Sequence, residues 1–184
     1  VNGPIALGHV RLSILDLSER GHQPFLTADG NGVLVYNGEV YNFREIRANL
    51  ELEGIRFRSN TDTEVVLYAL HHWGPEKAIP LFNGMFGLAY FDLRSQTLWI
   101  ARDRMGIKPA YLTQNSNFIA FASEIKALLA HPRVSSEPDT PSLGSFLTYQ
   151  RLEGDWTPFK GIEQVPPGSF LKITPSKVEK FVYF

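Results

Sequence analysis

The sequence predicts an α+β fold, in which antiparallel sheets pack against helices that lie in separate blocks of the chain. Residues 85–102 contain two apolar, strand-like runs around a short polar turn, which is typical of an antiparallel hairpin. Residues 169–183 show the same arrangement. Helix signals gather between residues 42 and 82 and again between 123 and 149, rather than after every strand. Alternating βαβ units are therefore not expected.

Composition limits the classes of protein to consider. The 184 residues suffice for one domain, and a hydrophobic content of 43% is ordinary for a globular protein. A formal net charge of −1 provides no general attraction to nucleic acid or to an anionic membrane. The absence of cysteine excludes disulfides, a thiolate zinc site and a cysteine nucleophile within these residues.

Targeting signals are also missing from the sequence. No apolar run approaches the length of a membrane span, and no signal peptide is visible, so a cytoplasmic protein is expected. The first residue is Val rather than Met, which indicates processing or a fragment.

A strand is predicted from residue 5 to 15, with apolar side chains on both faces. Arg11 is then a cation surrounded by Leu12, Ile14 and Leu15. A buried guanidinium needs a carboxylate partner. That partner is either an acidic residue of the chain or the carboxylate of a ligand.

The heptapeptide at 36–42 is the most informative stretch, because it follows an apolar run that predicts a buried strand. On a continuing strand, Asn37 and Glu39 share one face, and Gly38 lets a ligand approach the backbone N–H. A carboxamide beside a free N–H is a donor pair that stabilises an oxyanion, and the carboxylate suits an ammonium group. The alternative is a type I′ turn at Asn37-Gly38, which these seven residues alone favour.

The first helix is predicted to begin at Asn42. Glu45 completes a capping box, Ile46 and Leu50 lie one turn apart, and Gly54 ends the helix. This explains Asn42 as a structural residue.

A second helix is predicted after a short strand at 55–58. Thr61 and Glu64 form a second capping box. Asp62 then lies in the first turn, where the helix dipole favours an anion. It is either a dipole partner or a contact for a cationic group of a ligand.

The rest of the chain divides into short elements. Helices are predicted over 75–82, 123–129 and 143–149, and strands over 85–92, 98–102, 110–113, 118–122, 169–173 and 178–183. The charged turn at 102–109 is expected to be an ion-paired loop that covers the end of a sheet. We expect a core at 1–132 and a closing segment of the same domain at 133–184, with a linker at 133–142 and an irregular stretch at 150–168.

Several strings together carry a resemblance to a known family. The chain resembles the glutaminase domain of asparagine synthetases, which are class II glutamine amidotransferases of the N-terminal-nucleophile hydrolase superfamily. The strings are GHVRLSILD at 8–16, YNGEVYN at 36–42, SNTDTEV at 59–65, GMFGLAYFD at 84–92, RDRMGIKPAYL at 102–112, SEIKALL at 123–129 and KGIEQVPPGSFLKI at 160–173. They follow one another in the right order from residue 8 to residue 173, so the resemblance extends over nearly the whole chain.

The resemblance implies a four-layer αββα sandwich without its first strands. It implies that glutamine is hydrolysed to glutamate and ammonia, and that ammonia passes through a channel to a synthetase domain. That domain, absent from this chain, uses ATP and Mg²⁺ to convert aspartate to asparagine. No cofactor or metal is expected in this domain, and a homodimer is one expected assembly.

The resemblance also assigns roles to individual residues. The side-chain amide of Asn37 and the N–H of Gly38 form the catalytic oxyanion hole, and Glu39 and Asp62 hold the α-ammonium group of glutamine. Arg11 binds the α-carboxylate. The full substrate-binding set is Arg11, Leu12, Ile14, Leu15, Asn37, Gly38, Glu39 and Asp62, in which Ile14 and Leu15 wall the pocket.

One departure from the family bears directly on activity. The family uses an N-terminal cysteine activated by its own α-amino group, and this chain has neither that cysteine nor the R-G-P-D stretch. We therefore expect a fragment that is inactive alone. Two alternatives remain open: a non-catalytic scaffold domain, as in β-lactam synthetases, and an amidotransferase domain with a different ammonia acceptor.

Overall fold

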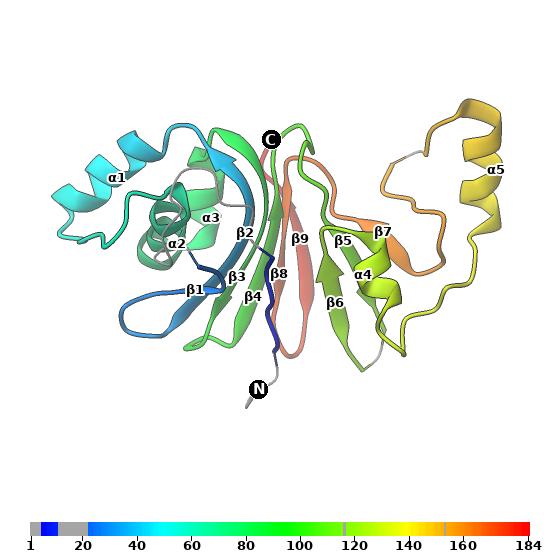
Figure 1. Cartoon of the computed structure of the whole chain (residues 1–184), viewed down its shortest axis with the longest axis horizontal. Helices are drawn as coiled ribbons and strands as arrows, with labels where there is room; N and C mark the ends of the chain where they lie inside the picture. The colour runs from blue at the N-terminus through cyan, green and yellow to red at the C-terminus, as the bar shows by residue number, and fades with distance from the viewer. Residues whose placement is uncertain (1–4, 11–21, 116, 153) are drawn as a thin grey trace.

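Two antiparallel sheets lie between helices, as the computed structural model shows (Figure 1). The structure describes residues 5–10, 22–115, 117–152 and 154–184. The helices on one side of the sheets are α1 (Phe43–Leu52), α2 (Asp62–Trp73), α3 (Pro75–Ala78) and the 3₁₀ turn Ile79–Leu81. On the opposite side lie α4 (Ile125–Leu129) and α5 (Thr140–Tyr149). No helix in these ranges is long and apolar enough to cross a bilayer.

The larger sheet has six strands in the order β1-β2-β3-β4-β8-β9. Its strands are β1 (Phe25–Leu26), β2 (Gly32–Val40), β3 (Gly84–Asp92), β4 (Thr97–Arg102), β8 (Ser169–Ile173) and β9 (Val178–Val182). The predicted hairpins are therefore confirmed as β3–β4 and β8–β9.

Strand β2 decides between the two interpretations of the heptapeptide. It pairs with β3 over its whole length, and Asn37 and Gly38 face Gly87 and Phe86 in the middle of that ladder. The type I′ turn is therefore wrong, because the strand runs straight through this dipeptide. The partner strand begins more than forty residues later in the chain.

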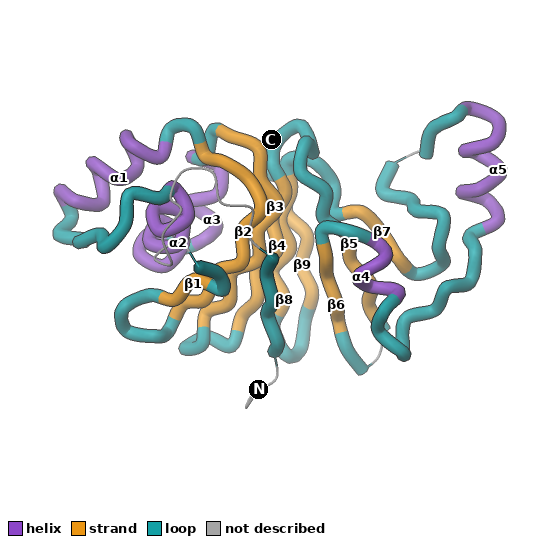
Figure 2. The backbone as a smooth tube through the Cα atoms, in the orientation of Figure 1, coloured by secondary structure: helices purple, strands orange, loops and turns teal. Residues whose placement is uncertain are grey.

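The smaller sheet has three strands in the order β6-β5-β7 (Figure 2). They are β5 (Tyr111–Gln114), β6 (Ile119–Ala122) and β7 (Ile162–Gln164). Strand β7 lies inside the segment that we expected to be irregular. It is only three residues long and carries no apolar alternation, so its pairing with β5 is the only feature that makes it a strand.

Two hydrophobic cores follow from the alternation of side chains along β2. Leu34 and Tyr36 pack in the core beneath the helices, whereas Val35 packs in the core between the two sheets. Because alternate residues of a strand share a face, Asn37 and Glu39 lie on the same side as Val35. They are therefore directed toward the space between the sheets.

The first predicted strand is not formed over the residues that the structure describes there. Residues 5–10 have no regular secondary structure, and residues 11–15 lie outside the described ranges. Ile5 and Leu7 pack against the core between the sheets, but Val10 is 98% exposed. The segment is therefore buried on one side only.

The N-terminal ends of α1 and α2 differ from the predicted capping boxes. Asn42 precedes α1 but makes no side-chain cap; its amide donates to Leu81 O and accepts from Asn83 N. At α2, the Thr61 hydroxyl does cap, by accepting from the N–H of Glu64.

The Glu64 carboxylate does not close the second box, because it accepts from backbone N–H groups farther upstream. It binds the N–H groups of Arg58 (2.9 Å) and Ser59 (2.6 Å). The backbone at Arg58 and Ser59 is therefore held by a side chain, and the short strand predicted at 55–58 is absent.

The turn at 102–109 is held by backbone groups rather than by ion pairs. Arg102 and Asp103 are both buried, and no ion pair of either is found within the described residues. The Asp103 carboxylate accepts from the backbone N–H groups of Phe86, Met105, Ile107 and Lys108. The expected ion-paired loop is therefore wrong in its bonding, although the turn does close the end of a sheet.

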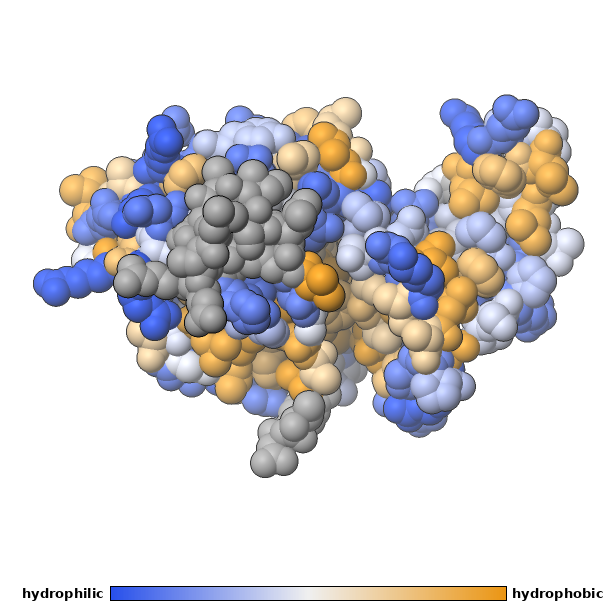
Figure 3. Space-filling model, in the orientation of Figure 1, coloured by the Kyte–Doolittle hydropathy of each residue, from blue (hydrophilic) through white to orange (hydrophobic). Residues whose placement is uncertain are grey.

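Helix α5 begins at Thr140, three residues earlier than predicted. Asp139 caps it by accepting from the N–H of Ser142, so the cap lies inside the stretch interpreted as a linker. Hydrophobic side chains of α5 reach the surface (Figure 3), and Leu147 is 80% exposed.

Candidate active site

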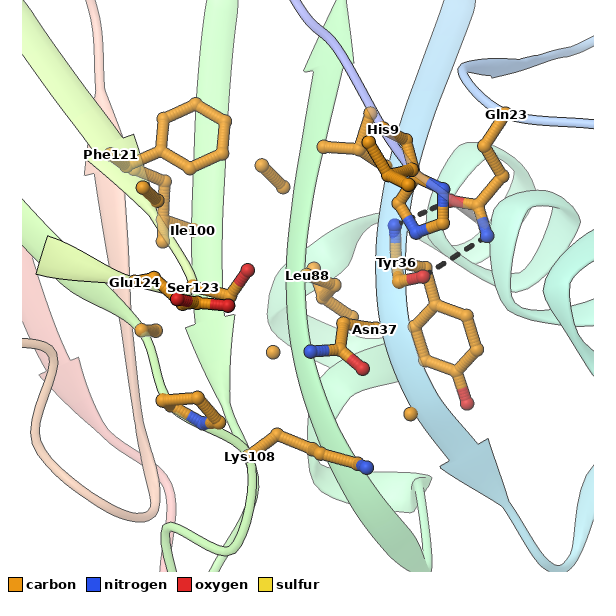
Figure 4. A pocket seen from close by; sticks show the side chains of 18 of the residues that line it. His9, Gln23, Tyr36, Asn37, Leu88, Ile100, Lys108, Phe121, Ser123 and Glu124 are labelled. Carbon is orange, nitrogen blue, oxygen red and sulfur yellow. Dashed lines mark hydrogen bonds between the residues drawn. The ribbon is translucent and has the colours of Figure 1, made fainter. Parts of the chain in front are cut away.

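A cavity of about 890 Å³ opens between the two sheets. This volume lies within the range of roughly 300–1,000 Å³ that is usual for small-molecule sites. Figure 4 shows that β2 and β3 form one wall of the cavity and that β6 and the start of α4 form the opposite wall. The residues labelled there are His9, Gln23, Tyr36, Asn37, Leu88, Ile100, Lys108, Phe121, Ser123 and Glu124.

The structure brings half of the predicted site residues together. Asn37, Gly38, Glu39 and Asp62 all line this one cavity, although Asp62 is more than twenty residues from the others. The predicted residues Arg11, Leu12, Ile14 and Leu15 lie outside the described ranges. The cavity is therefore lined by the residues that carry the amide, the peptide N–H and the two carboxylates that the sequence singled out.

Gly38 is required at its position by the backbone. Its φ of 156° falls in a region that L-residues rarely adopt, and a Cβ atom there would lie 2.0 Å from Met85 O. Glycine avoids both the strain and the clash, so β2 and β3 can approach closely at this point.

The hydrogen-bonding direction of the Gly38 N–H follows from its neighbours on β2. The N–H of Tyr36 is directed away from β3, because it donates to Gln23 Oε1 (2.6 Å), and the N–H of Val40 does the same by donating to Asp62 Oδ2 (3.1 Å). N–H directions alternate along a strand, and Gly38 is two residues from both Tyr36 and Val40. Its N–H is therefore directed to the same edge of β2, away from β3. No acceptor for it lies among the described residues, which leaves a donor available to a ligand.

Asp62 is fixed in place by β2. One of its carboxylate oxygens accepts from the Tyr36 hydroxyl (2.8 Å) and from the N–H of Val40 (3.1 Å), and the residue is only 5% exposed. Burial and the neighbouring Asp62 charge raise the pKa of Tyr36 well above its usual value, so this hydroxyl remains a donor. The second oxygen of Asp62 has no partner within the described part of the chain.

Gln23 is a site residue that sequence reasoning missed. Its side-chain amide donates to Tyr36 O (3.0 Å) and accepts from Tyr36 N (2.6 Å), as the dashed lines in Figure 4 show. Strand β1 begins only at Phe25, so Gln23, two residues earlier, continues the edge of the sheet with its side chain instead of its backbone. Tyr36 and Lys108 were also missed, because the signals for both are contacts with residues distant in the sequence.

Metal binding has no obvious ligand set here. Within the residues that the structure describes, no group of three or more His, Cys, Asp or Glu side chains is arranged to hold an ion.

Comparison with known proteins assigns the chain to a family. Residues 1–184 match the family described as a glutamine amidotransferase domain. The chain belongs to that family. This glutamine amidotransferase domain is 35% identical over 184 residues to "Asparagine synthetase [glutamine-hydrolyzing] 3" of Bacillus subtilis, an alignment that covers 98% of this chain and 30% of that protein. It is 36% identical over 171 residues to "Asparagine synthetase [glutamine-hydrolyzing] 1" of the same organism, covering 93% and 27%.

The amidotransferase domain also resembles solved structures. Glutamine phosphoribosylpyrophosphate amidotransferase from B. subtilis aligns with a TM-score of 0.65 and 18% identity, covering 96% of this chain and 34% of that one. This likeness confirms the Ntn-hydrolase type of fold predicted from the resemblance. The chain spans 27–30% of the length of the two asparagine synthetases, so it corresponds to the glutamine amidotransferase domain of asparagine-synthetase-like proteins.

Proposed function

We propose that this domain binds L-glutamine in the cavity between the sheets and supports its hydrolysis to glutamate and ammonia. The observation that carries the proposal is the convergence of Asn37, Gly38, Glu39 and Asp62 on one cavity, in a chain whose whole length matches a glutamine amidotransferase family. A scaffold with no ligand has no need for this combination of groups.

Each end of glutamine has a complementary group in this arrangement. The α-ammonium group binds between Glu39 and the free oxygen of Asp62, because carboxylates form strong charge-assisted hydrogen bonds to ammonium. The γ-carbonyl oxygen accepts from the Asn37 amide and the Gly38 N–H. These donors become more effective as that oxygen gains negative charge in the tetrahedral intermediate. Arg11 is proposed to bind the α-carboxylate.

The cysteine nucleophile that the family resemblance implies is not among these residues. Hydrolysis consumes one water, breaks the γ C–N bond and releases ammonia, and the family resemblance implies that a cysteine thiolate forms the intervening thioester. The 184 residues contain no cysteine. We therefore propose that they bind glutamine without turning it over.

The fate of the ammonia is proposed from the relatives. Both asparagine synthetases are named as glutamine-hydrolysing, which favours delivery of ammonia to an ATP- and Mg²⁺-dependent domain that amidates aspartate. A different acceptor is the alternative, because the acceptor is chosen outside this domain.

Isothermal titration of the purified 184-residue chain with L-glutamine tests the proposal. Binding of L-glutamine but not D-glutamine is expected, with no ammonia released during overnight incubation. The Glu39→Gln variant is expected to weaken binding about tenfold, since one charged contact to the ammonium is lost and a tenfold change equals about 1.4 kcal/mol. Glu45→Gln, an exposed change on α1, is the matched control.

The two ways in which this proposal can fail are separate. A chain that is folded but does not bind L-glutamine would favour the scaffold alternative. Ammonia release by the chain alone would show that another residue serves as the nucleophile.

A further inference from the structure

We infer that Lys108 is the cation that stabilises negative charge at the reacting end of the site, and that it makes the cavity select the γ-carboxylate of glutamate over the γ-amide of glutamine. This inference rests on the proposed function. It adds to the oxyanion site a charged residue from the turn between β4 and β5.

The fold places Lys108 beside Asn37. Gly87 faces Asn37 across the β2–β3 ladder, and a Cβ atom built on Gly87 would lie 3.8 Å from Lys108 Cβ. Asn37 and Lys108 therefore flank the same glycine on the same face of the sheet. Figure 4 shows the Lys108 side chain reaching from the turn toward the wall that carries Asn37.

The Lys108 backbone is held from both sides, which fixes where its side chain begins. Its N–H donates to Asp103 Oδ2 (2.9 Å), and its carbonyl accepts from Arg102 Nε (2.8 Å). Asp103 and Arg102 are themselves buried. A lysine at this position is therefore built into the cavity wall.

The ammonium group of Lys108 has no acidic partner within the part of the chain that the structure describes. No hydrogen bond or ion pair of its ammonium group is present among the described residues, although Lys108 is half-buried. The other lysine of the cavity, Lys126, differs because it is 81% exposed and pairs with Glu124 at 2.6 Å. Lys108 is thus the cation available to a ligand bound next to Asn37.

The proposed reaction creates negative charge where this cation lies. The γ-amide of glutamine is neutral, but the tetrahedral intermediate carries an oxyanion and the product carries a γ-carboxylate. A positive charge favours both anions over the amide, and its effect is larger in a partly desolvated cavity than in water. It also offsets the repulsion that Glu39 and Asp62 exert on an anionic ligand.

Parallel titrations of the 184-residue chain with L-glutamate and L-glutamine test this role. The Lys108→Met variant keeps the length of the side chain and removes the charge. It is expected to weaken L-glutamate binding about tenfold, equal to about 1.4 kcal/mol, while L-glutamine affinity stays within twofold. Lys108→Arg should restore L-glutamate binding, and Lys126→Met should change neither affinity.

The salt dependence of L-glutamate affinity is a second measurement. It would not change in Lys108→Met if Lys108 had only a structural role. L-glutamate affinity of the parent chain should fall between 50 and 500 mM NaCl, and this dependence should be weaker in Lys108→Met because screening then has one less charge to act on.

Three results would overturn the inference. An equal loss of both affinities in Lys108→Met would show that the residue only shapes the cavity. Unchanged L-glutamate binding would show that its charge does not reach the ligand. If the folded parent chain binds neither compound, the proposed function itself fails and this inference fails with it.

Discussion

At the scale of single residues, Gly38 shows how a backbone requirement and a chemical one coincide. The close approach of β2 to Met85 excludes any side chain, and the same bare backbone leaves the N–H accessible from the cavity. Substitution at this residue therefore affects stability as well as binding.

Gly38→Ala is predicted to destabilise the domain. Backbone strain at positive φ typically costs about 1–3 kcal/mol, and the clash with Met85 O adds to it. Urea denaturation measures the change. Gly144→Ala is the matched control: Gly144 lies inside α5 with open space around it, so alanine should stabilise that helix by about 0.5–1 kcal/mol. Equal effects at the two sites would contradict the role of Gly38.

At the scale of elements, the turn between β1 and β2 is organised by one carboxylate. Asp29 accepts from the Thr27 hydroxyl (2.6 Å) and from the N–H and side chain of Asn31, and Arg94 lies 2.7 Å from it. These hydrogen bonds, led by that of Thr27, hold the pKa of Asp29 well below its usual 3.8.

The lowered pKa of Asp29 predicts the sign of a pH effect. A carboxyl whose folded-state pKa is depressed adds stability that is fully present above its unfolded pKa and is lost as the pH falls through the folded-state value. Asp29→Asn should therefore lower the melting temperature at pH 7, and the difference from the parent chain should shrink as the pH falls below about 4. Thermal melts from pH 7 to pH 3 measure this, with the exposed Glu163→Gln as control. A difference that stays constant over this range would show that Asp29 does not act through its charge.

The elements also show what sequence reasoning can reach. β3 and β4 were predictable because their apolar runs and their turn are adjacent in the chain. The interpretation of Asn37-Gly38 as a turn failed because the strand that holds them extended, β3, lies far along the sequence. Strand β7 was missed for the same reason, since only its pairing with β5 defines it.

For the candidate site, too, the sequence showed the local clusters of residues but not the tertiary contacts between them. Asn37, Gly38 and Glu39 are visible as a local cluster, and Asp62 as an acid at the start of a helix. That Asp62 joins them depends on the Tyr36 hydroxyl and the Val40 N–H, which are tertiary contacts. Lys108 approaches Asn37 only through the packing of the turn between β4 and β5 onto Gly87.

At the scale of the whole molecule, one guanidinium joins the two sheets. Arg102 ends β4, and it donates to the carbonyl of Val165 (2.9 Å) and the side chain of Gln164 (3.1 Å) at the end of β7. It also holds its own turn through Lys108 O (2.8 Å) and Gly106 O (2.9 Å). Arg102 therefore links the end of β4 in the larger sheet to the end of β7 in the smaller one.

Arg102→Lys is predicted to destabilise the domain by about 3 kcal/mol or more. An ammonium cannot reproduce the planar set of donors, so at least two hydrogen bonds from a charged donor, each contributing roughly 1.5–3 kcal/mol, are lost. Chemical denaturation measures the loss. The exposed Arg56→Lys should change stability by less than about 0.5 kcal/mol. A near-neutral Arg102→Lys would mean that the sheets are held together by their apolar core alone.

The way Gln23 completes the edge of β2 has a consequence for how a substrate is received. A side-chain amide binds the N–H of Tyr36 and a carboxylate binds the N–H of Val40, whereas the N–H of Gly38 between them has no acceptor among the described residues. An amide ligand bonded to that N–H would take the place of one peptide unit of an added strand, as in β-augmentation. In that arrangement the bound substrate adds one hydrogen-bonded unit to the edge of the larger sheet, next to Gly38.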